Sequence, residues 1–152
     1  MSIADDILNY CETLDSNNDP AMGDCNAFVK NVAGQFGVTI NASLNADGIV
    51  GSFGSAPFTK TTMDPTTAMS WANDGLVIAG MTKTELNAGY GPHSNGHVAV
   101  VHNIADSNHR NFPMASWGVL GGRGKSDASI RLSFPAAACD ADAVHFAFAP
   151  TI

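Results

Sequence analysis

The sequence predicts an α+β fold in which N-terminal helices pack on an antiparallel sheet. Up to about residue 72, apolar residues recur at helical spacing, whereas the chain after residue 75 contains short apolar runs typical of strands. No helical pattern separates these strands, so neighbouring strands are expected to pair antiparallel. The chain has 152 residues with no internal repeat, and we expect residues 1–152 to form a single domain.

Three helices are expected in the first half of the chain. The first covers about residues 3–14, with its apolar residues on one face. The second begins at Asp24, a preferred capping residue, and Gly37 is expected to end it. The third starts with Pro65, which suits the first position of a helix. Residues 41–60 are rich in Gly, Ser and Asn and are expected to form a long surface segment.

A run of strands follows these helices. The loop at residues 82–96 joins the first two strands. Residues 82–95 of this loop and residues 41–60 are expected to form the walls of a cleft. In the last strand, Val144, Phe146 and Phe148 alternate and are expected to point inward. The expected strands cover residues 76–79, 97–101, 114–120, 130–134 and 144–149.

Composition and charge exclude two classes of partner. The net charge is −7 and the chain holds only seven Lys and Arg residues, which opposes binding to the phosphates of nucleic acid. No apolar run is long enough to cross a bilayer, so no membrane insertion is expected. The N-terminal segment is acidic where a signal peptide would be basic, which predicts synthesis in the cytoplasm without a signal peptide.

The predicted position of Cys25 favours the thiolate form of its side chain. Because Asp24 caps the second helix, Cys25 falls in its first turn, where free N–H groups and the helix dipole stabilise an anion. We therefore expect the pKa of this thiol to lie below its usual value of about 8.5. The backbone N–H of Cys25 is a candidate donor for an oxyanion hole. Three and four residues later come Phe28 and Val29, so the thiol should face the sheet.

His97 is the natural partner of this thiol. It begins a strand directly after Gly96, which leaves room beside the imidazole. A thiol paired with an imidazole can attack an acyl group, and the imidazole can then protonate the leaving amine. Spacing alone leaves a second interpretation open, in which Cys25 is an inert buried thiol and His97 an ordinary residue at a strand end.

Three motifs follow one another in a characteristic order. They read Asp-Cys-Asn-Ala-Phe-Val at residues 24–29, Asp-Gly-Leu-Val-Ile-Ala-Gly at residues 74–80, and Gly-His-Val-Ala-Val-Val at residues 96–101. In this order they resemble the NlpC/P60 cysteine peptidases, a papain-like family. Within it they look most like the type VI secretion amidase effectors, antibacterial toxins that cut peptidoglycan. The likeness covers about residues 20–125.

The resemblance implies a peptidoglycan amidase with no cofactor and no metal, in which Cys25 is the nucleophile and His97 the general base and acid. The bond cut would be an amide at diaminopimelate, either within a stem peptide or across a cross-link. A type VI secretion apparatus would deliver the protein to the periplasm of a target Gram-negative cell. There it would degrade the cell wall, and a periplasmic immunity protein would protect the producer's kin.

The same resemblance implies a third polar residue that orients the imidazole, and two candidates remain open. His109 lies twelve residues beyond His97, and Ser116 follows the Pro-Met segment at residues 113–114. The other two cysteines, Cys11 and Cys139, are either bridged or buried as small apolar residues. In oxidised protein we expect a bridge between them.

Particular residues argue against two other kinds of site. A zinc site at His93 and His97 is disfavoured, because Gly and Pro around them oppose the required helix. Residues 121–126 end like a phosphate-binding loop, but Val119 stands where its first glycine belongs. Two alternatives stay open: a phage or housekeeping cysteine wall hydrolase, and a catalytically inactive cell-wall-binding module of the same fold.

Overall fold

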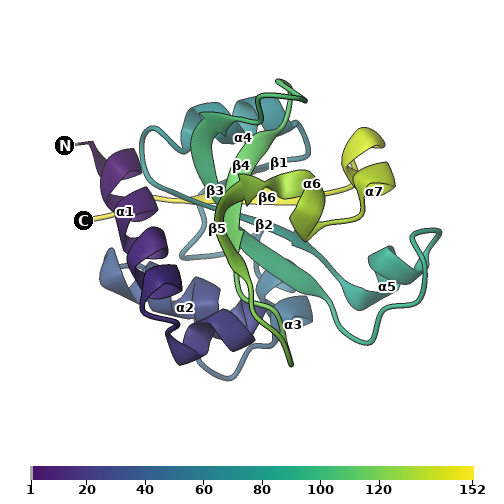
Figure 1. Ribbon diagram of the computed structural model, residues 1–152, viewed down its shortest axis with the longest axis horizontal. Helices are drawn as coiled ribbons and strands as arrows, with labels where there is room; N and C mark the ends of the chain where they lie inside the picture. Colours follow the sequence, from purple (N-terminus) through teal and green to yellow (C-terminus); the bar gives the residue numbers. More distant parts are fainter. Residues whose placement is uncertain (1) are drawn as a thin grey trace.

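The computed structural model describes residues 2–152 and has the α+β architecture that the sequence predicts (Figure 1). Six strands form one antiparallel sheet in the order β1-β6-β2-β3-β4-β5. The strands are β1 (Lys60–Thr62), β2 (Leu76–Met81), β3 (His97–Ala105), β4 (Pro113–Trp117), β5 (Lys125–Ser129) and β6 (His145–Ala149). The helices are α1 (Ile3–Ser16), the 3₁₀ helix η1 (Pro20–Gly23), α2 (Cys25–Gln35), α3 (Ala46–Gly51), α4 (Pro65–Trp71), α5 (Lys83–Asn87), α6 (Ile130–Ser133) and α7 (Ala136–Asp140).

Helices cover both faces of the sheet. The N-terminal helices α1, α2 and α3 form an apolar layer with one face, and α4, α6 and α7 form a second layer with the other (Figure 1). Side chains of the central strands alternate between these layers, so Ile78 belongs to the first layer and Val77 to the second. Every residue of β2 is buried, as expected for a strand covered on both sides. No helix in the described part of the chain is long and apolar enough to cross a membrane.

The second helix has the start and the end that the sequence predicts. Its inner stripe includes Phe28 and Val32, both fully buried against the sheet. Gly37 follows the helix in the left-handed region, with φ of 78°. The N–H of Val38 then donates to the carbonyl of Ala33 over 2.9 Å, which satisfies a carbonyl at the helix end.

The prediction of a strand at residues 130–134 is wrong, because these residues form the short helix α6. Ser129 caps this helix through its Oγ, which accepts a hydrogen bond of 3.2 Å from the N–H of Arg131. Pro135 follows as the residue that precedes α7. The strand in this part of the chain is β5, which comes just before α6 at the edge of the sheet.

Two short helices lie inside segments that were expected to be loops. The Asn45 side chain caps α3 within residues 41–60. Thr82 and Glu85 form a capping box that starts α5 within residues 82–96. Helices this short carry too few apolar positions to show a periodic pattern, so only their caps were visible in the sequence.

The expected bridge between Cys11 and Cys139 is absent, and all three cysteines are free. Cys11 is buried in the layer formed by α1, whereas Cys139 is buried in the layer of α7 on the opposite face of the sheet. A disulfide needs its two Cα atoms within about 7 Å, which a sheet between them prevents. Both residues therefore act as small buried apolar side chains.

Candidate active site

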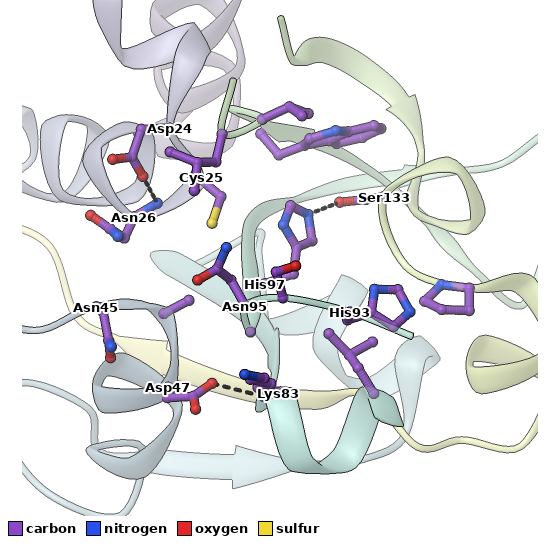
Figure 2. A pocket seen from close by; sticks show the side chains of 18 of the residues that line it. Asp24, Cys25, Asn26, Asn45, Asp47, Lys83, His93, Asn95, His97 and Ser133 are labelled. Carbon is purple, nitrogen blue, oxygen red and sulfur yellow. Dashed lines mark hydrogen bonds between the residues drawn. The ribbon is translucent and has the colours of Figure 1, made fainter. Parts of the chain in front are cut away.

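The two residues singled out from the sequence line the same pocket. Cys25 lies at the start of α2 and His97 at the start of β3, and both line a pocket of about 580 Å³. Figure 2 shows their side chains reaching toward the same space from these two elements. The segments expected to form cleft walls also line it, through Asn45 and Asp47 from one and Lys83 from the other.

The hydrogen bonds at the start of α2 leave one donor free. Asp24 Oδ1 accepts the N–H of Asn26 at 3.0 Å and that of Ala27 at 3.4 Å. The Asp24 carbonyl accepts the N–H of Phe28. Apart from the sulfur of its own side chain, the N–H of Cys25 has no acceptor among the described residues, so it is the one donor of the first turn left for a ligand. The expected oxyanion-hole donor therefore bonds no other residue in the described part of the chain.

The expectation of a lowered pKa for the Cys25 thiol is wrong. Its side chain is only 7% exposed, and burial raises the pKa of this thiol above its ordinary value. The backbone N–H groups of Val98, Asn26 and Cys25 itself act in the opposite direction, without overcoming burial. The contact with Val98 also places the thiol against the start of β3, next to His97. Cys25 is therefore a neutral thiol at rest.

His97 is held on one side by a serine. Its Nε2 lies 2.7 Å from Oγ of Ser133, and its ring packs edge-on against Phe134, with 4.9 Å between the ring centroids. Burial, and to a smaller extent the charge of nearby His93, lower the pKa of His97 to about 4. At neutral pH the imidazole is uncharged. Since Ser133 occupies Nε2, Nδ1 is the ring nitrogen left to receive a proton.

Ser133 is the partner of His97 that the sequence did not identify. It comes from α6, 36 residues further along the chain, in a stretch that was expected to be a strand. A lone serine on a four-residue helix carries no motif, and only the fold brings it to the imidazole. Figure 2 shows the hydrogen bond between the two side chains at the edge of the pocket.

Neither of the two residues considered for this role contacts His97. His109 Nδ1 lies 3.6 Å from Asp106 Oδ2, in the turn that follows β3. Ser116 Oγ lies 2.6 Å from His102 Nε2 and accepts the N–H of Asp127 at 3.0 Å. Ser116 is fully buried and pairs with Val100, whose side chain belongs to the layer of α1 and α2. Its hydroxyl therefore lies on the opposite face of β3 from the His97 ring.

The rest of the pocket is lined by both apolar and polar residues. Its apolar residues include Leu120 and Leu132, which are 63% and 65% exposed and so offer apolar surface at the rim. Its polar residues are mostly uncharged amides and hydroxyls. Among residues 2–152, no three His, Cys, Asp or Glu side chains gather so that they could hold a metal ion. The polar lining consists of Asp24, Asn26, Asn45, Asp47, Lys83, His93, Ser94, Asn95 and Ser133.

No model of a known protein family matches this chain. A search of curated proteins finds no match either.

Proposed function

We propose that this protein is a cysteine amidase of the NlpC/P60 papain-like type that hydrolyses an amide bond in the peptides of the bacterial cell wall. One observation carries the proposal: a helix-start thiol with a free N–H shares a pocket with an imidazole whose far nitrogen is held by a serine. Acyl transfer needs these parts together, namely a nucleophile, a base, an orienting group and a donor for the oxyanion.

The neutral resting pair determines how attack would proceed. The sulfur of Cys25 bonds to the carbonyl carbon while its proton passes to Nδ1 of His97, and the carbonyl electrons move onto oxygen. The imidazolium then gives that proton to the amide nitrogen as the carbon–nitrogen bond breaks. Water, deprotonated by His97, then attacks the thioester carbon, the carbon–sulfur bond breaks to release the acid, and the proton returns from His97 to the sulfur of Cys25. Ser133 accepts a hydrogen bond from Nε2–H throughout and so keeps Nδ1 available as the base.

The motifs at residues 24–29, 74–80 and 96–101 support the substrate and the setting. Through their likeness to type VI secretion amidase effectors, we propose cleavage at diaminopimelate, within a stem peptide or across a cross-link. The protein would be an antibacterial toxin, carried by a type VI apparatus into the periplasm of a rival Gram-negative cell. An immunity protein that covers the pocket would be its natural inhibitor.

The test is digestion of purified sacculi by wild-type protein and by Cys25→Ala, with mass spectrometry of the released fragments. We expect the variant to lose at least about 10⁴-fold in rate, because no other group replaces the nucleophile. Cys139→Ala makes the same change in the opposite layer and is the matched control, expected to stay active. The termini of the fragments identify the bond that is cut.

Release of the same fragments by Cys25→Ala would refute the proposal. If neither protein releases fragments and both bind sacculi equally well, the chain is a binding module of the same fold. Fragments that do not end at diaminopimelate would leave the cysteine amidase in place and overturn the proposed bond.

A further inference from the structure

The free donor at the start of α2 is a single N–H group. Of the N–H groups in the first turn, three are already bonded within the capping structure, and only that of Cys25 is available. Enzymes that stabilise a tetrahedral oxyanion aim more than one fixed donor at it, and each donor contributes strongly. A pocket that performs acyl transfer should therefore contain a second donor near the sulfur of Cys25.

Asn95 is the candidate for this second donor. It lines the pocket, and Figure 2 shows it pointing from the loop before β3 toward the sulfur of Cys25. Its amide carries two N–H donors, is exposed and makes no hydrogen bond with any described residue. Asn26 is the neighbouring amide, but Figure 2 shows its side chain directed away from His97.

The loop that carries Asn95 is fixed on both sides. Before it, the N–H of His93 donates to Asn87 Oδ1 at 2.7 Å, and Asn87 Nδ2 donates to the His93 carbonyl at 3.1 Å. After it, Gly96 is packed so closely that a Cβ there would collide with Asp47 Oδ1 and lie 2.9 Å from the Met81 carbonyl. The backbone on both sides of Asn95 is therefore fixed, while its side chain is exposed and can turn its amide toward a bound substrate.

We propose that the side-chain amide of Asn95 and the backbone N–H of Cys25 together form the oxyanion hole. This inference rests on the proposed acyl transfer. As the bond between sulfur and carbon forms, the electron pair of the carbonyl bond moves to oxygen, and the two donors bind that oxygen. When the carbon–nitrogen bond breaks, the pair returns to re-form the carbonyl, and the donors are released for the deacylation step.

The experiment compares Asn95→Ala and Asn95→Asp with Asn103→Ala. Asn103 lies on β3 outside the pocket, and its Nδ2 donates to Asn73 Oδ1, so Asn103→Ala controls for the loss of a side-chain amide. We expect Asn95→Ala to lower kcat on sacculi about 100-fold with little change in KM. Asn95→Asp keeps the shape but replaces the donor with a negative charge, and it should lose more. Asn103→Ala should match the wild type.

A second substrate separates this inference from the proposed function. p-Nitrophenyl acetate acylates Cys25 through an oxyanion whatever the natural substrate is, whereas alkylation by iodoacetamide forms none. We expect Asn95→Ala to slow acylation by a similar factor and to leave alkylation unchanged. If the wild type does not cleave sacculi but acylation shows this pattern, the oxyanion-hole inference is supported and the proposed substrate is wrong.

Three results would overturn the inference. The first is an Asn95→Ala protein within about threefold of wild type on a substrate that still requires Cys25. The second is equal slowing of acylation and alkylation, which would mean that Asn95 acts on the thiol. The third is the absence of both acylation and hydrolysis in the wild type, which would end the proposed function as well.

Discussion

Two groups of Cys, Ser and His side chains lie in different surroundings in this molecule. The pocket group is Cys25, His97 and Ser133, and the buried group is Cys11, His102 and Ser116. In each group a histidine Nε2 meets a serine hydroxyl, at 2.7 Å in the pocket group and 2.6 Å in the buried group. Burial lowers the pKa of both histidines to about 4, and Ser116 also hydrogen-bonds the Cys11 thiol.

The difference between the groups lies in access and in helix position. The buried group is sealed, with Cys11 and Ser116 fully buried and His102 3% exposed. Cys11 lies inside α1, where burial raises the pKa of its thiol to about 12. Cys25 instead starts its helix and faces a pocket with its own N–H free. Residue types alone therefore do not distinguish the two groups, whereas a helix start that opens on a pocket does.

The largest expected contrast comes from replacing each histidine in turn. His97→Gln should lower the rate on sacculi by about 10³-fold or more, because the proposed general base is gone, with little loss of stability. His102→Gln should leave the rate of the folded protein unchanged and lower the free energy of unfolding by about 1–3 kcal/mol, because a buried hydrogen bond is disturbed. Kinetics and urea unfolding of both variants measure this. Equal loss of activity in the two would remove the distinction between the groups.

Acid should affect the buried group through stability. The pKa of His102 falls from 6.5 in the unfolded chain to about 4 in the folded protein. Between these values the unfolded state binds a proton that the folded state does not, so stability decreases as pH falls from about 6.5 to 4. At 1.36 kcal/mol per pH unit the full loss is about 3 kcal/mol. Above pH 6.5 the residue contributes no pH dependence.

Urea unfolding at several pH values measures this loss. His102→Gln should show a shallower decline between pH 7 and 4.5 than the wild type. His97 faces the pocket, so its share should be smaller than that of His102. Parallel curves for wild type and His102→Gln would show that His102 does not titrate in this way.

Local signals explain what was predictable from the sequence. The α+β class and the positions of Cys25 and His97 follow from a capping Asp24, an apolar stripe and a strand start, all of which involve neighbours in the chain. Ser133 could not be predicted, because its role depends on where α6 lies in the folded molecule. The prediction of a lowered pKa for the Cys25 thiol was wrong for the same reason. The helix start is a local feature, whereas burial against β3 depends on the tertiary structure.

The smallest expected contrast separates the two serines. Ser133→Ala should lower kcat about tenfold at unchanged KM, since the imidazole loses the acceptor that keeps Nδ1 available as the base. Ser116→Ala should leave kcat unchanged, because its hydroxyl meets His102 on the other face of β3.

A pH profile shows whether Ser133 acts on the imidazole or only on the fold. Ser133→Asp places a carboxylate at Nε2, which favours the imidazolium, so the pKa of His97 should rise and the acid limb of kcat/KM should move upward from about 4. Ser116→Asp places the same negative charge in the buried group, where it should unfold most of the protein. The acid limb of kcat/KM for the protein that remains folded should not move. If the acid limb of Ser133→Asp stays at its wild-type position, the hydrogen bond to His97 only supports packing, and the pocket group loses its third member.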